Sequence, residues 1–155
     1  MATKKRSHEN WGGGVQVNQV RLASLAFDAG PDAEVPDDDR VTGNFILNVA
    51  RASLTEIAVE FGAEVEGIPH VTARCTYRAF YRLRPGSPEE QQPDAALLGV
   101  ATRVAPVMLY PFVREALQNA ASRAGLPDFL LQIVSFSSLF SDFELPAVEE
   151  EVEET

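Results

Sequence analysis

Cysteine and histidine are scarce in this sequence. Its 155 residues include one cysteine, Cys75, and two histidines, His8 and His70. A single cysteine excludes an internal disulfide and every metal site built from clustered cysteines. Two histidines leave few candidates for histidine-dependent catalysis, and His70 directly follows a predicted turn at Gly67-Ile68-Pro69. We therefore predict no metal ion, no cofactor and no catalytic residue.

Phosphate-binding loops, membrane spans and signal peptides are also missing. Gly12-Gly13-Gly14 precedes a predicted strand rather than a helix, so it cannot cradle a phosphate. No run of about 18 apolar residues is apparent. The basic start, Lys4-Lys5-Arg6, is not followed by the apolar stretch of a signal peptide. We expect a cytoplasmic protein without a membrane span.

Basic residues are fewer than acidic ones: the chain has 13 Lys and Arg and 23 Asp and Glu, which gives a net charge of -10. Such a chain repels phosphate backbones, so nucleic acid is not an expected partner. Residues 1–14 are polar and glycine-rich, and residues 144–155 carry six glutamates. Both ends are predicted to be disordered, serving either solubility or a partner. Residues 15–143 are predicted to form one domain.

Alternating apolar and polar residues predict two neighbouring strands, over residues 56–66 and 71–84. The turn between them predicts an antiparallel hairpin, and keeping the apolar faces together fixes the parity of its register. Shifting one strand by two residues along the other keeps the same faces together, but side chains that were directly opposite become diagonal neighbours. One such register sets Glu64 opposite Arg74, Glu60 opposite Arg78 and Glu56 opposite Arg82.

Two strand-like runs precede this hairpin. One begins near Asn44 and alternates through Phe45, Leu47 and Val49. The other covers residues 15–28, and its apolar residues change face twice. Each change of face requires a bulge unless the strand is covered on both sides. The three apolar pairs are Val15 with Val17, Val20 with Leu22, and Leu25 with Phe27.

Helical signals follow the strands. The sequence predicts a short helix over residues 94–104, capped by Asp94 and broken by Pro106. A longer helix is predicted over residues 109–124, with Pro111 in its first turn and Gly125 directly after its end. Strands followed by helices predict an α+β fold with the helices on one side of an antiparallel sheet.

Apolar surface is abundant in the last third of the chain. One face of the longer helix is apolar, and two interpretations stay open: it packs on the sheet of its own chain, or one stripe packs there while another meets a second subunit. Between residues 126 and 143 lie ten large apolar residues, more than a simple cap on the core requires. Such an excess is typical of subunit interfaces and of grooves for apolar ligands.

Three motifs resemble the SecB family of protein-export chaperones. Leu109-Tyr110-Pro111-Phe112-Val113-Arg114-Glu115 resembles the aromatic-Pro-aromatic-Ala-Arg-Glu run that opens the family's long helix. Ser122-Arg123-Ala124-Gly125-Leu126-Pro127 resembles its Ser-Arg-Gly-x-x-Pro run. Ile133-Val134-Ser135-Phe136-Ser137-Ser138-Leu139-Phe140 is similar to its Pro-Val-Asn-Phe-Asp-Ala-Leu-Tyr/Phe motif. The first strand also resembles the family, so the resemblance spans about residues 15–143.

The resemblance implies a four-stranded antiparallel sheet with two helices, assembled as a dimer of dimers. It implies an ATP-independent chaperone that holds unfolded precursor proteins for export. It also implies an apolar substrate groove lined by a sheet strand and the aromatic C-terminal segment, and an interface on the long helix. The groove residues would be Ala73, Cys75, Tyr77, Phe129, Leu131, Phe136, Leu139 and Phe140. The interface residues would be Phe112, Val113, Ala116, Leu117, Ala120 and Ala124.

The family docks to the SecA motor through acidic groups on the exposed sheet face. Asp28 fits one such position, whereas Ser24 and Arg74 stand where acids are expected. Two partners therefore stay open. One is SecA, and the other is a toxin–antitoxin pair of the kind that SecB-like chaperones bind. From the residues alone, a hotdog-like small-ligand enzyme and a module with one fixed partner also stay open, although the enzyme would need a polar catalytic group at its pocket.

Overall fold

The structure is a computed structural model that describes residues 14–35, 41–132, 135–136 and 139–148. The predicted arm therefore lies almost wholly outside the described residues, as does the last part of the predicted tail, residues 149–155. Four residues of the third motif, Ile133, Val134, Ser137 and Ser138, also lie outside them.

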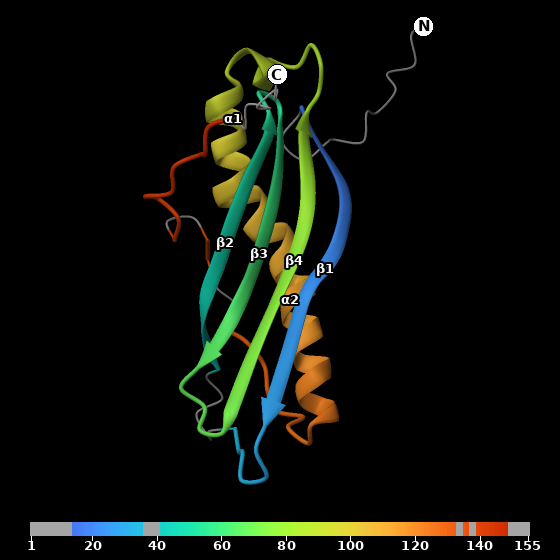
Figure 1. Ribbon diagram of the computed structural model, residues 1–155, viewed down its shortest axis with the longest axis vertical. Coiled ribbons are helices and arrows are strands. Elements are labelled where there is room, and N and C mark those ends of the chain that lie inside the picture. Colours follow the sequence, from blue (N-terminus) through green and yellow to red (C-terminus); the bar gives the residue numbers. More distant parts are fainter. Residues whose placement is uncertain (1–13, 36–40, 133–134, 137–138, 149–155) are drawn as a thin grey trace, which may run out of the picture.

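Four antiparallel strands form one sheet, and a long helix crosses one of its faces (Figure 1). The strands are β1 (Val15–Ala29), β2 (Thr42–Ser53), β3 (Glu56–Glu66) and β4 (Val71–Leu83). Their order across the sheet is β1-β4-β3-β2, so β1 and β2 are the edges. The predicted α+β class and four-stranded antiparallel sheet are confirmed.

The β3–β4 hairpin adopts the predicted register. Glu56 lies opposite Arg82, and the two other predicted glutamate–arginine pairs are also directly opposed. Only the Glu56–Arg82 pair closes to ion-pair distance within the described residues, at 3.6 Å, with both side chains about half exposed. Exposed pairs contribute about 0.2–1 kcal/mol each, so this ladder selects the register more than it stabilises the sheet.

Both predicted changes of face in β1 coincide with irregularities of its pairing with β4. One register shift falls between Asn18 and Arg21 and the other between Leu22 and Ser24. At the first, Gln19 adopts a left-handed backbone conformation with a φ of 54°. An extra residue in one strand turns the following side chains to the other face, which is what the apolar pattern demanded.

The two predicted helices are present, but the predicted break at Pro106 is wrong. Helix α1 (Pro93–Gly99) continues through a π turn (Val100–Val104) into α2 (Ala105–Arg123). The N–H of Ala105 donates to the carbonyl of Val100, a wider bond than in an α-helix. A proline ring normally clashes with the carbonyl four residues back, and the widened turn lies where that clash would occur.

Two further details of this helix differ from the prediction. Pro111 lies inside α2 rather than in its first turn, on the solvent side, where water can satisfy the carbonyl that loses its partner. Asp94 is not the cap, because the helix starts at Pro93, a residue suited to a first helical position. The predicted end is confirmed: Gly125 has a φ of 85°, and the N–H of Leu126 donates to the Ala121 carbonyl at 2.8 Å.

The core lies between the helix and the inner faces of β3 and β4. Leu109, Val113 and Leu117 of α2 are fully buried against apolar side chains of the two strands. By length and composition alone, the helical run Pro93–Arg123 would also suit a membrane, with a mean hydropathy of 1.6 in its most apolar window. Its buried stripe instead packs on the sheet, as expected of a core helix.

Candidate functional site

The segment after α2 is held against that helix by polar contacts. The hydroxyl of Tyr110 donates to the backbone carbonyl of Gln132, and Nε of Arg114 donates to the carbonyl of Leu131 at 2.8 Å. Leu131 also forms a parallel bridge with Val41, which directly precedes β2. These contacts fix where the following aromatic residues lie.

A cluster of aromatic rings joins this segment to the sheet and the helix. Phe136 contacts Phe45, Phe61 and Tyr110 with ring centroids 5.2–5.4 Å apart in edge-on arrangements. Phe140 lies farther out, with its ring 6.2 Å from that of Phe61. Edge-to-face aromatic contacts at these distances are favourable, so the cluster ties the C-terminal segment firmly to the core.

Outside this cluster lies a groove of about 400 Å³ between the start of the helical run and the C-terminal segment. Phe136 and Phe140 form part of its wall. Among the residues that the structure describes, the lining holds one charged side chain, Arg103, and no carboxylate, histidine or cysteine. The described lining residues are Ala95, Leu98, Gly99, Thr102, Arg103, Phe136, Phe140, Ser141 and Phe143.

The structure divides the predicted groove residues among three places. Phe136 and Phe140 line the groove, and Leu139 is 45% exposed between them in sequence. Tyr77 is half-buried beside α2. The remaining four, Ala73, Cys75, Phe129 and Leu131, are buried in the core of the chain. Burial raises the pKa of the Cys75 thiol to about 11, which agrees with an inert side chain.

A second hollow of about 310 Å³ lies between α2 and the edge strand β1. Leu25 of β1 and Phe112 of α2 border it and are 43% and 42% exposed. Tyr77 packs on Phe112 with ring centroids 5.5 Å apart. Burial, followed by the charges of Cys75 and Glu115, raises the pKa of Tyr77.

This hollow separates the predicted interface residues into two groups. Val113 and Leu117 are fully buried against the sheet of their own chain. Phe112, Ala116, Ala120 and Ala124 remain at least partly accessible on the other side of α2. An interface on this helix would therefore use the accessible group, together with Leu25 of β1.

Sequence reasoning did not assign the part of the groove that comes from α1, or the contact that anchors α1. Arg51 is 6% exposed, and its guanidinium lies 2.6 Å from Asp94 at the helix start. The same group donates to the carbonyls of Ser53 and Leu54. A signal for the groove was present: Leu98 follows the buried Leu97, so it must lie off the buried stripe.

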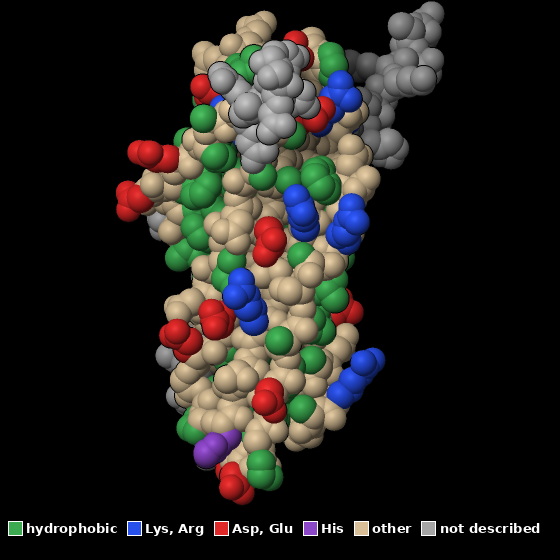
Figure 2. All heavy atoms as spheres, viewed as in Figure 1, with side chains coloured by type: hydrophobic (Ala, Val, Ile, Leu, Met, Phe, Trp, Pro, Cys, Tyr) green, Lys and Arg blue, Asp and Glu red, His purple; other side chains and the backbone are tan. Residues whose placement is uncertain are grey.

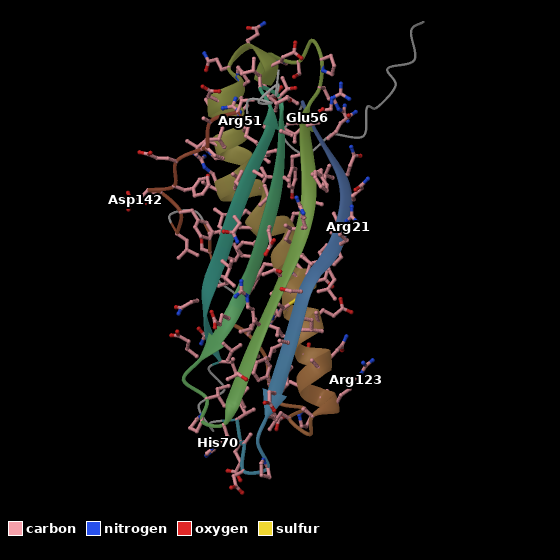
Figure 3. The ribbon with its side chains drawn as sticks, in the orientation of Figure 1. Arg21, Arg51, Glu56, His70, Arg123 and Asp142 are labelled. Atoms are coloured by element: carbon pink, nitrogen blue, oxygen red, sulfur yellow. The ribbon has the colours of Figure 1, made fainter. Side chains whose placement is uncertain are left out.

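The remaining candidates lie elsewhere. Asp28 is exposed near the end of β1, opposite Thr72 on the outward face of the sheet. On the same face the hydroxyl of Ser24 is 2.7 Å from that of Thr76. His70 is exposed in the β3–β4 turn, far along the sheet from Asp142 beside the groove (Figure 3). Within the described residues, no group of three His, Cys, Asp or Glu side chains is placed to hold a metal.

Comparison with known families identifies a relationship over the second half of the chain. The family described as "Preprotein translocase subunit SecB" matches residues 72–144. A "Protein-export protein SecB" of Anaplasma phagocytophilum is 31% identical over 94 residues, covering 59% of this chain and 57% of that protein. One of Anaplasma marginale is 28% identical over 94 residues, covering 59% and 51%. The chain thus spans about half the length of the curated relatives it matches.

A solved structure shares the fold. A SecB-like chaperone of Mycobacterium tuberculosis, in complex with a ChAD peptide from the HigA1 antitoxin, aligns with a TM-score of 0.56 at 18% identity. The alignment covers 78% of this chain and 91% of that one. The resemblance inferred from the sequence motifs is therefore confirmed: the chain is related to the SecB family.

Proposed function

We propose that this SecB-related chain is an ATP-independent chaperone that binds unfolded precursor proteins and holds them for export. The relationship over residues 72–144 supports this proposal. The observation that carries it is the open groove beside α1, with Phe136, Phe140 and Phe143 in its wall. A groove whose described lining combines aromatic side chains with no carboxylate or histidine suits binding of many apolar segments better than a specific reaction.

The accessible apolar surface is divided between two uses in this proposal. The groove and the exposed Leu139 bind the client chain. The hollow between α2 and β1 packs against sister subunits in a homotetramer, a dimer of dimers. Four chains of 16.9 kDa would give a particle of about 68 kDa. The protein acts in the cytoplasm, with residues 1–14 and 144–155 as arm and tail around the chaperone domain at 15–143.

The decisive experiment measures suppression of aggregation of an unfolded protein without ATP. Phe140→Ala and Leu139→Ser should weaken suppression at least about threefold, because each removes apolar contact at or beside the groove. Leu54→Ser is the matched control, since Leu54 is 62% exposed in the β2–β3 turn and lies outside the groove lining. Equal suppression by all four proteins would show that the groove does not bind clients.

A second candidate function has a specific observation in its favour. The structural neighbour from Mycobacterium tuberculosis was solved with a peptide from an antitoxin. Moreover, the resemblance implies acids for SecA docking at the positions that Ser24 and Arg74 occupy, and only Asp28 fits this expectation. Binding of purified SecA would favour the export role, whereas binding of an antitoxin segment and not of SecA would favour the alternative.

The enzyme alternative predicts turnover at an apolar pocket. A hotdog-like thioesterase would require a carboxylate or histidine at the groove; the lining residues that the structure describes include neither, and His70 lies in a distant turn. We propose that the protein is not an enzyme. Hydrolysis of acyl-CoA that is lost on changing a carboxylate or histidine would overturn this conclusion.

A further inference from the structure

The outward face of the sheet is divided by charge along its strands. Residues directly opposed in antiparallel strands share a face, so the pairing places four arginines on the β1 and β4 half. The neighbouring β3 carries glutamates on the same face. Figure 2 views this face and shows basic side chains gathered toward the β1 side of its upper half. We call the set Arg21, Arg74, Arg78 and Arg82 the arginine face.

The bulge in β1 brings two of these arginines into direct opposition. After the left-handed Gln19, Arg21 pairs with Arg78 across the strands. Like charges that face each other destabilise a strand pair. Arg21 donates to the Gln19 side chain at 2.6 Å, and the Arg78 guanidinium lies 5.1 Å from the ring centre of Phe80. Neither arginine has an ion-pair partner among the described residues, although acidic residues outnumber basic ones 23 to 13.

The described chain ends near the same end of the sheet. Phe143 lines the groove together with Ala95 at the start of α1. Next to Ala95, Asp94 pairs with Arg51 of β2 at 2.6 Å. Arg51 and Glu56 both lie at the upper end of the sheet in Figure 3, Arg51 buried toward the helix and Glu56 paired with Arg82 on the outward face.

The last seven residues carry enough charge and length to reach the arginine face. Five of them are glutamates: Glu149, Glu150, Glu151, Glu153 and Glu154. Seven extended residues span at most about 24 Å. Arg78 lies four residues along β4 from Arg82, which is about 14 Å in a strand. An extended acidic segment of this length can therefore cross both arginines.

We propose that the acidic tail, residues 149–155, docks on the part of the arginine face that holds Arg21, Arg78 and Arg82. The tail neutralises the opposed Arg21 and Arg78, which form no ion pair among the described residues. Because it is tethered, its effective concentration is in the millimolar range, so weak individual ion pairs suffice. A covered face would admit an acidic segment of another protein only by displacing the tail.

The test uses a fluorescent peptide with the sequence of residues 144–155 and a chain that ends at Val148. Fluorescence anisotropy should show the peptide binding the shortened chain at about 20 mM salt and losing at least about tenfold in affinity at 500 mM. The full chain should bind the peptide about fivefold more weakly than the shortened chain, because its own tail competes. Equal affinity of the two chains would show that the tail leaves the face open and would overturn the proposal.

Two substitutions in the shortened chain locate the site. Arg78→Gln should weaken peptide binding at least about threefold. Arg123→Gln is the matched control, because Arg123 is an exposed arginine at the far end of α2 (Figure 3) and should leave binding unchanged. Equal losses in both variants would reveal diffuse charge attraction instead of a site. None of these readouts depends on chaperone activity, so the proposed function can fail while this proposal stands.

Discussion

Strands β3 and β1 carry similar apolar residues and meet opposite environments. In β3, Ile57, Val59 and Phe61 are at most 1% exposed. In β1, Val17, Leu22 and Leu25 are 40–46% exposed. The difference follows from position: β3 lies inside the sheet beneath the helix, whereas β1 is an edge bordered by a hollow. Apolar residues on an uncovered edge indicate surface that stays available for binding.

The largest effect on stability is expected from a substitution in the buried strand β3. Phe61→Ala removes a fully buried ring that contacts Phe45, Tyr110, Phe136 and Phe140. We expect the free energy of unfolding to fall by about 3–5 kcal/mol, measured by urea denaturation. The matched substitution Leu25→Ala in β1, measured at a protein concentration at which the subunits are dissociated, should cost less than about 1 kcal/mol. Similar losses at both sites would show that Leu25 is covered within its own chain.

The outward side of β3 is the next most sensitive point. A methyl group on Gly62 would lie 2.0 Å from the carbonyl oxygen of Cys75 and 2.6 Å from Thr76. Gly62→Ala should therefore destabilise the chain by about 3 kcal/mol, because backbone must move. Gly99→Ala is the control: nothing lies within 4 Å, and the helical position should gain about 0.5–1 kcal/mol. A neutral Gly62→Ala would contradict the close approach of β3 and β4.

The buried thiol gives a pH-dependent prediction. Burial raises the pKa of Cys75 from 9.0 to about 11, so the folded chain keeps the proton where the unfolded chain loses it. Stability from this group is complete below pH 9 and is lost as the pH rises from about 9 to 11, by at most about 2.7 kcal/mol in all. Denaturation curves of wild type and Cys75→Ala at pH 8 and 10.5 measure the effect. The wild type should lose more stability than the variant between these pH values, and equal losses would contradict the assignment.

The smallest effect on stability should accompany a large effect on assembly. Leu25→Gln changes a side chain that is 43% exposed beside the hollow, so the free energy of unfolding of the dissociated chain should change by less than about 0.5 kcal/mol. Light scattering after size exclusion should show a smaller particle than the wild type forms. A wild-type particle of 17 kDa, or a variant that assembles as the wild type does, would show that the hollow beside Leu25 is not a subunit interface.

Patterns that are local in sequence predicted much of the fold. The hairpin register follows from alternation and from glutamates facing arginines, and the bulges of β1 follow from its changes of face. Gly125 predicted the end of α2 because a glycine readily adopts the left-handed conformation that closes a helix. The break at Pro106 was predicted wrongly because a π turn can accommodate a proline, and no local signal distinguishes that turn from a helix end.

The candidate site was less accessible to such reasoning. The excess of aromatic residues predicted a groove, and Phe136 and Phe140 do line one. Composition did not reveal that Phe129 and Leu131 complete the core, or that α1 supplies the opposite wall. The roles of the groove and interface residues stay predictions until clients and subunits are measured.

The sequence by itself determined the strands, their pairing partners in the hairpin and the apolar faces, because side-chain alternation and turn residues act over a few positions. Only the tertiary structure decided which apolar residues are covered. Burial depends on the order β1-β4-β3-β2 and on a helical run laid across one face, and both join residues far apart in the chain.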